Sequence, residues 1–130
     1  MLYRYVYIST SHDLSREEVD RILASSQRNN AKADITGVML YNGRNFLQML
    51  EGQSAGLNAL MRRIGNDPRH TGITMLHSGE IEERTCPDWA MRRIAIRDDA
   101  NARREILIQD LPGSLDDQVR DLILNFATLN

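Results

Sequence analysis

The pair Asn42-Gly43 stands between two runs of strand-forming residues, DITGVMLY before it and RNFLQMLEG after it. Asn-Gly is the pair most typical of a two-residue type I′ turn between antiparallel strands. The sequence therefore predicts a β-hairpin here. Because the turn fixes the register, we expect three cross-strand pairs: Tyr41 with Arg44, Met39 with Phe46, and Gly37 with Gln48.

Both faces of this hairpin are apolar, and side chains alternate between them along each strand. One face carries Ile35, Met39, Phe46, Gln48 and Leu50, and the other carries Val38, Leu40, Leu47 and Met49. Both faces therefore need to be covered by other parts of the protein.

The elements around the hairpin predict the order βαββαββ. LYRYVYIST is the first strand, and Ser15 with Glu18 forms a capping box that begins a helix running to about Asn30. A second helix follows the hairpin, and GITMLHS and WAMRRIAI are two further strands. Since the βα-connected strands can lie parallel and central, we expect an α+β, ferredoxin-like sheet with both helices on one face.

From about residue 101 the sequence changes to two helical stretches separated by LPGS. The second stretch carries an apolar stripe formed by Val119, Leu122, Ile123 and Phe126. We expect this C-terminal pair of helices, or alternatively a second subunit, to cover the other face of the hairpin.

Composition excludes several classes of function. The 130 residues carry a net charge of −2, which gives no basic face for nucleic acid. No apolar run resembles a signal peptide or a membrane span, and the single cysteine, Cys86, fits a reducing compartment. The histidines show no metal-ligand spacing, and there is no GxGxxG, P-loop or GxSxG motif. We expect a one-domain cytoplasmic protein without membrane or nucleic-acid partners.

Gln48 is the most informative polar residue, because a buried amide needs hydrogen-bond partners. The predicted register places Gly37 opposite it, which would leave room for the amide. Asn30 lies on the inward stripe of the first helix, and Tyr7 lies on the first strand. We expect these polar groups to meet at a small-molecule pocket lined by Ile35, Met39 and Phe46. Taken singly, a glutamine in a strand is more often solvent-facing, and strand tyrosines more often pack in a core.

At these residues the sequence closely resembles the BLUF domain, a blue-light receptor that binds FAD. The resemblance covers residues 1 to about 97 and rests on YVYIS, SQRNN, ITGVMLY, FLQMLEG, DPRH and DWAM. It implies a flavin-binding domain at 1–97 followed by a C-terminal helical cap at 98–130, as in short stand-alone members. One departure is Cys86, where many members carry phenylalanine.

The resemblance implies a role for each matching residue. Tyr7 would donate an electron and a proton to the photoexcited flavin, and Gln48 would then change its hydrogen bonding by rotation or tautomerisation, which gives a red-shifted signalling state. The flavin-binding residues would be Asn29, Asn30, Ile35, Gln48, Arg69 and His70. Trp89 and Met91 would relay the signal along the last strand.

The leading hypothesis is thus a photosensor that is not an enzyme and signals in trans to an effector protein, with homo-oligomerisation expected. The alternative is a flavin-dependent oxidoreductase, against which the sequence offers no nicotinamide fingerprint. A third hypothesis, an interaction module that no longer binds flavin, conflicts with the presence of Tyr7, Asn30 and Gln48.

Overall fold

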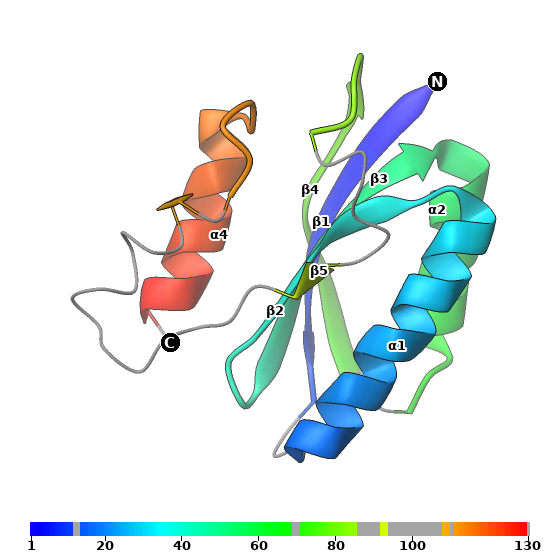
Figure 1. Cartoon of the computed structure of the whole chain (residues 1–130), viewed down its shortest axis with the longest axis vertical. Helices are drawn as coiled ribbons and strands as arrows, with labels where there is room; N and C mark the ends of the chain where they lie inside the picture. The colour runs from blue at the N-terminus through cyan, green and yellow to red at the C-terminus, as the bar shows by residue number, and fades with distance from the viewer. Residues whose placement is uncertain (12–13, 69–70, 86–91, 94–107, 110, 130) are drawn as a thin grey trace.

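Five strands form a single sheet in the order β4-β1-β3-β2-β5, with helices on both faces (Figure 1). The computed structural model describes residues 1–11, 14–68, 71–85, 92–93, 108–109 and 111–129. The strands are β1 (Leu2–Thr10), β2 (Thr36–Tyr41), β3 (Asn45–Gln53), β4 (Thr71–Ile81) and β5 (Arg92–Arg93). The helices are α1 (Arg16–Ala33), α2 (Ser54–Gly65) and α4 (Asp117–Leu129). The α+β, ferredoxin-like fold expected from the sequence is confirmed.

The two strands that are followed directly by a helix, β1 and β3, lie next to each other at the centre of the sheet. They run antiparallel, so the expectation that the central strands are parallel was wrong. The reason is that α1 connects β1 to β2, and β3 lies between these two strands. β3 therefore runs antiparallel to both of its neighbours. β4 pairs antiparallel with β1, and β5 pairs parallel with β2.

The β2–β3 hairpin forms, but its register differs from the predicted one. Tyr41 pairs with Phe46 and Met39 pairs with Gln48. The backbone of Arg44 has left the ladder: its N–H donates to Asn42 Oδ1 at 3.0 Å, and its carbonyl accepts from Ser11 N–H at 2.9 Å. The Asn42 side chain thus builds a longer loop than a two-residue turn. A shift of two residues keeps every side chain on its expected face.

Gly37 is explained by the backbone and not by the amide of Gln48. It pairs with Leu50, and a Cβ atom at this position would overlap the backbone oxygen of Met49. The prediction that Gly37 makes room for Gln48 was therefore wrong. The glycine allows β2 and β3 to approach each other closely.

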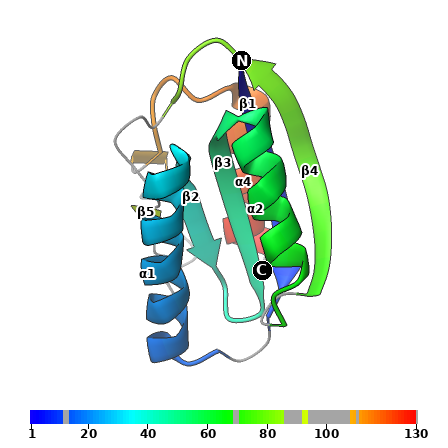
Figure 2. The ribbon, with the colours of Figure 1, turned by 90° about the vertical axis from the view of Figure 1, so that its right-hand side faces the viewer.

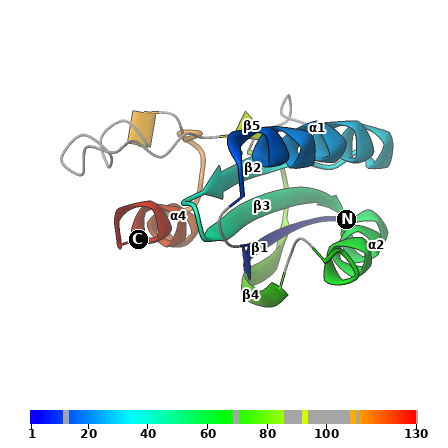
Figure 3. The same cartoon turned by 90° about the horizontal axis from the view of Figure 1, so that it is seen from below.

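Two apolar clusters sandwich the sheet, one on each face. α1 and α2 cover one face, and Figures 2 and 3 show α4 on the opposite side. The cluster beneath α1 and α2 contains Tyr7, Ile35, Met39, Phe46 and Leu50. The cluster beneath α4 contains Val38, Leu40, Leu47 and Met49 together with Val119, Ile123 and Phe126. The C-terminal region therefore covers the second face of the hairpin. This was one of the two expected alternatives, the other being a second subunit.

The start of α1 follows the sequence signal. The Ser15 side chain accepts from Glu18 N–H at 3.1 Å, and Glu18 Oε1 accepts from Ser15 N–H at 3.2 Å, which completes the capping box. These hydrogen bonds lower the pKa of Glu18. The helix ends at Ala33, about one turn later than predicted, with Asp34 in the left-handed conformation.

Some predicted elements fall outside the described residues. WAMRRIAI is described only at Arg92–Arg93, and most of the first C-terminal helical stretch is not described. Within the described part of the chain, no helix is both long and apolar enough to cross a membrane.

Candidate functional site

A cavity of about 90 Å³ opens between α1 and α2, with β3 as its floor. α1 contributes side chains spaced by about one turn, α2 contributes a second wall, and Gln48 is the contribution of β3. The lining residues are Ile22, Ser25, Ser26, Asn29, Asn30, Gln48, Leu60, Arg63, Ile64 and Asp67. Apolar groups and uncharged amides therefore share one space, which is typical of a site for a small organic molecule.

Gln48 stands between this cavity and Tyr7. The two residues are direct cross-strand partners in the β1–β3 register. The Tyr7 hydroxyl donates to Gln48 Oε1 at 2.7 Å, and the side chains are 0% and 3% exposed, respectively. Tyr7 does not line the cavity, whereas Gln48 does. A change inside the cavity can therefore reach Tyr7 through one amide group.

Burial controls the protonation of Tyr7. Removal of the phenol from water raises the pKa of Tyr7 well above its ordinary value, because the charged tyrosinate is poorly solvated there. Tyr7 is therefore a neutral hydrogen-bond donor throughout the physiological pH range. Its hydroxyl hydrogen is directed at a single acceptor, Gln48 Oε1.

Asn30 and Asn29 lie where the helical spacing predicts them. Asn30 is buried at 1% exposure, and its neighbour Asn29 is exposed at the mouth of the same cavity. Asn30 and Gln48 therefore present two amides from two different elements to one space. Of the three polar residues expected at the pocket, Asn30 and Gln48 therefore line the cavity, whereas Tyr7 lies behind Gln48.

The apolar lining differs from the prediction. Ile35, Met39 and Phe46 belong to the buried cluster beneath α1 and α2 and do not line the cavity. The cavity is lined instead by Ile22 and Leu60, with Ile64, because the two helices and not the hairpin form its walls. The predicted site residues Arg69, His70, Trp89 and Met91 lie outside the described residues.

Two charged groups at the cavity were missed by the sequence reasoning. Arg63 projects from the last turn of α2, and Asp67 follows shortly after the helix. Both follow Leu60 at helical spacing, at i+3 and i+7. Arg63 and Asp67 could have been identified if the helical spacing of the inward-facing residues of α2 had been continued past its apolar residues.

Metal chemistry finds no support in the part of the chain that the structure describes. There, no group of three or more His, Cys, Asp or Glu side chains is placed to hold a metal ion.

The sequence profile of one family matches residues 2–92, and its description is "BLUF: Sensors of blue-light using FAD". The chain belongs to the BLUF family. It is thus a blue-light photoreceptor domain, and FAD is the chromophore of the family.

Relatives within the family include both fused and short proteins. Photoactivated adenylate cyclase subunit beta of Euglena gracilis is 33% identical over 125 residues, which is 95% of this chain but 13% of that protein. The solved structure of a BLUF protein, BlrB in the dark state, is 30% identical with a TM-score of 0.73 over 96% of both chains. Klebsiella pneumoniae BlrP1 gives a TM-score of 0.84 and 27% identity over 98% of this chain and 33% of that chain. The chain thus spans a small part of the cyclase subunit and nearly all of BlrB.

The lining of the cavity fits a flavin ring. Ile22, Leu60 and Ile64 offer apolar contact to the faces of a flat heterocycle. The amides of Asn30 and Gln48 offer donors and acceptors that match ring carbonyl and imide groups. Pockets for small molecules usually exceed roughly 300 Å³, so the side chains that line this cavity of about 90 Å³ would have to move apart to admit a three-ring system.

Proposed function

We propose that Tyr7 and Gln48 are the photoactive pair of this blue-light sensor, and that the chain itself catalyses no reaction. The observation that carries the proposal is the 2.7 Å hydrogen bond from the buried Tyr7 hydroxyl to Gln48 Oε1, at the wall of the cavity. It gives one redox-active side chain a direct link to one switchable amide. No other described tyrosine is both fully buried and bonded to a residue of the cavity lining.

When bound, FAD absorbs blue light and supplies an excited ring that accepts an electron and a proton. Tyr7 is the donor. Its phenol is protonated before excitation, so the electron cannot come from a tyrosinate. A buried phenol that kept its proton after losing an electron would be an unpaired buried cation, which is costly. The hydrogen bond therefore directs the Tyr7 proton toward Gln48 Oε1 as the electron leaves.

The lasting change after this transfer is a new hydrogen-bond pattern of the Gln48 amide. An amide has a donor end and an acceptor end of nearly equal shape, so rotation or tautomerisation exchanges its hydrogen-bond pattern without changing net charge. Once Tyr7 has regained its electron and proton, only this pattern differs from the dark state. A buried network in which both hydrogen-bond patterns satisfy all polar groups can keep the new pattern for some time. The new pattern can then change the position of the neighbouring strands.

Other side chains hold the chromophore. Asn30, buried in the wall beside Gln48, would bind the polar edge of the ring, and Asn29 would act at the cavity mouth. We keep Arg69 and His70 as flavin-binding residues and Ile35 as an apolar support, on the basis of the family resemblance. Arg63 and Asp67 join them because they line the same cavity.

The output is proposed to be a change in protein contacts. Residues 1–97 would form the sensing domain and 98–130 the cap, with Trp89 and Met91 as relay. The match to nearly the full length of BlrB supports a sensor that acts on a separate effector in trans. Homo-oligomerisation and a cytoplasmic location remain part of the proposal.

The visible absorption spectrum of the purified protein, recorded in the dark, after blue light and again after darkness, tests this function. We expect a yellow protein whose flavin band shifts red and returns. Bleaching without return would favour an oxidoreductase. A colourless protein that does not take up added FAD would leave only an interaction module.

A further inference from the structure

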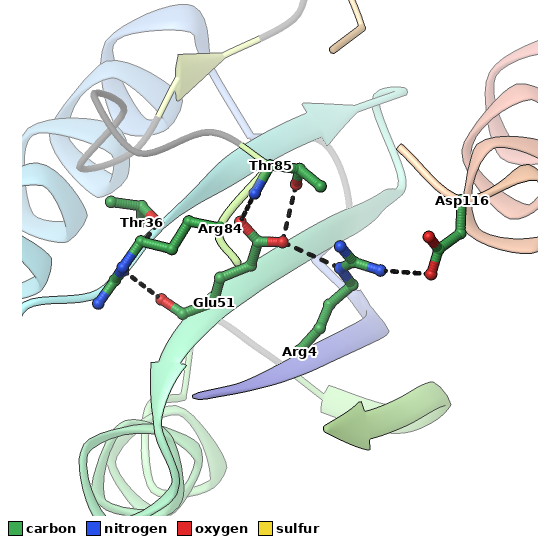
Figure 4. A network of polar contacts seen from close by, with 6 residues as sticks. All are labelled: Arg4, Thr36, Glu51, Arg84, Thr85 and Asp116. Carbon is green, nitrogen blue, oxygen red and sulfur yellow. Dashed lines mark hydrogen bonds and ion pairs between the residues drawn. The ribbon is translucent and has the colours of Figure 1, made fainter. Parts of the chain in front are cut away.

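Behind the sheet from the cavity, a fully buried carboxylate organises a polar network (Figure 4). Glu51 is 0% exposed. One of its oxygens accepts from Arg4 Nε at 3.0 Å and from Thr85 Oγ1 at 2.7 Å, and the other accepts from Thr85 N–H at 2.9 Å. Glu51 thus ties β3 to β1 and to the segment that follows β4.

Glu51 lies three residues after Gln48 on β3, so the two side chains point to opposite faces of the same strand. Arg84 reinforces the strand at this point. Its Nη1 donates to the Glu51 carbonyl oxygen at 2.9 Å and to Thr36 Oγ1 at 2.9 Å. A displacement of β3 that begins at Gln48 therefore has only three residues to cross before it moves Glu51, whose backbone is hydrogen-bonded to Arg84.

Arg4 extends the network to the C-terminal region. Its guanidinium, 2% exposed, also donates from Nη1 to Asp116 Oδ2 at 2.8 Å. Asp116 directly precedes α4, and its side chain is 61% exposed. One buried cation therefore joins the strand that carries Gln48 to the residue directly before the cap helix.

The surroundings of this bridge leave room for movement. A hollow of about 360 Å³ lies beside it, lined by Arg4, Arg84, Thr85, Ser114 and Asp116 among others. Apolar contacts with the sheet begin before α4 at Leu111 and Leu115 and continue on the helix at Val119, Ile123 and Phe126. The Arg4–Asp116 ion pair is thus a polar contact at the N-terminal end of α4, next to the hollow and to the apolar contacts of Leu115 and Val119.

We propose that Arg4 is a positioning residue that couples the light-driven change at Gln48 to the cap, through Glu51 on one side and Asp116 on the other. This inference rests on the proposed function. Arg4 bonds both carboxylates at once, so a shift of Glu51 that draws the guanidinium with it lengthens the Arg4–Asp116 contact. Light therefore loosens the start of α4.

Coupling of this kind is reciprocal. If light weakens the Arg4–Asp116 contact, then removing that contact must favour the light state over the dark state. The variant Asp116→Asn removes the charge of an exposed side chain and leaves the buried Arg4–Glu51 pair intact. Asp121→Asn is the matched control, because it makes the same charge change one turn further along α4, at an exposed side chain for which the described residues give no ion pair.

The experiment is hydrogen exchange of the α4 amides in the full FAD-loaded protein, in the dark and under blue light, recorded with the absorption spectrum and the dark-recovery rate. We expect light to raise exchange in the first turns of α4 in the unaltered protein. Asp116→Asn should raise it in the dark by roughly two- to five-fold, the range for an ion pair with one exposed partner. Its red shift should be unchanged and its recovery slower, whereas Asp121→Asn should match the unaltered protein.

The outcomes separate the two proposals. A normal red shift with no light-dependent change in α4 exchange would overturn the coupling role of Arg4 and leave the photoactive pair standing. The same holds if Asp121→Asn behaves as Asp116→Asn does. Absence of any red shift would overturn the proposed function and the coupling with it.

Discussion

At the scale of single residues, the proposed function of this BLUF domain depends on one hydrogen bond between neighbouring strands. Tyr7 and Gln48 meet because both lie on the same face of an antiparallel pair and are direct partners in it. The hydrogen bond satisfies the Tyr7 hydroxyl and Gln48 Oε1, which allows both groups to be buried there. In the proposed function the same contact provides the route for electron and proton.

Tyr7→Phe should bind FAD but show no reversible red shift, because the donor hydroxyl is gone while the ring volume is kept. The measurement is the light-minus-dark absorption spectrum. Tyr5→Phe is the matched control, since the Tyr5 hydroxyl lies on the same strand face but bonds to Asn58 at 2.7 Å. A normal photocycle in Tyr7→Phe would remove Tyr7 from its role as donor.

The protonation of Tyr7 also predicts a pH dependence of stability. Its pKa is raised in the folded state, so above pH ~10 the unfolded chain loses this proton while the folded protein keeps it. Folding stability should therefore fall as pH rises above this value, by about 1 kcal/mol near pH 10.5–11 from this residue alone. Urea unfolding at pH 8 and pH 10.8 should show a smaller loss for Tyr7→Phe than for the unaltered protein. Equal losses would contradict the raised pKa.

At the scale of elements, the hairpin sets the geometry of the site floor. The sequence predicted its strands, its two faces and the side of the sheet on which Gln48 lies, because period-two alternation is independent of the exact register. It did not predict the pairing, because the backbone of Arg44 is engaged by the Asn42 side chain and by Ser11. Contacts of that kind depend on tertiary structure that local turn preferences do not contain.

Gly37→Ala tests the close approach of β2 and β3. The new methyl group would overlap the Met49 backbone oxygen, which cannot move without breaking the strand pairing. We expect a loss of about 3 kcal/mol or more in the free energy of unfolding, as for severe overpacking. Gly65→Ala is the control, because a Cβ there meets no atom within 4 Å. Urea titration of both variants measures the difference, and equal stability would contradict the predicted overlap.

At the scale of the whole molecule, the sheet separates the two sites on which the proposals rest. One side carries the cavity between α1 and α2, and the other carries the Arg4–Glu51 network and α4. Two polar residues of the cavity, Asn30 and Gln48, could be predicted from helix and strand periodicity, but its apolar walls could not, because α1 and α2 form them and not the hairpin. The network could not be predicted either, because it joins residues that lie far apart in sequence and show no local pattern.

Ile123→Ala tests this separation. Ile123 is fully buried against the cap side of the sheet, so its truncation should lower the free energy of unfolding by about 2–5 kcal/mol. The position of the flavin band and its red shift should not change, because the cavity lies on the other face. Asn125→Ala, at an exposed position of the same helix, is the control for urea unfolding and for the spectrum. A displaced flavin band in Ile123→Ala would show that apolar packing beneath α4 sets the geometry of the cavity on the other face.

The light-minus-dark absorption spectrum of FAD-loaded Gln48→Leu tests the role of the photoactive pair most directly. Leucine keeps an apolar side chain of similar size but removes both ends of the amide. Gln53→Leu, at an exposed position on the same strand, is the control and should shift normally. We predict that Gln48→Leu binds flavin and lacks the red shift. A full, reversible red shift in Gln48→Leu would show that the switch lies elsewhere in the protein.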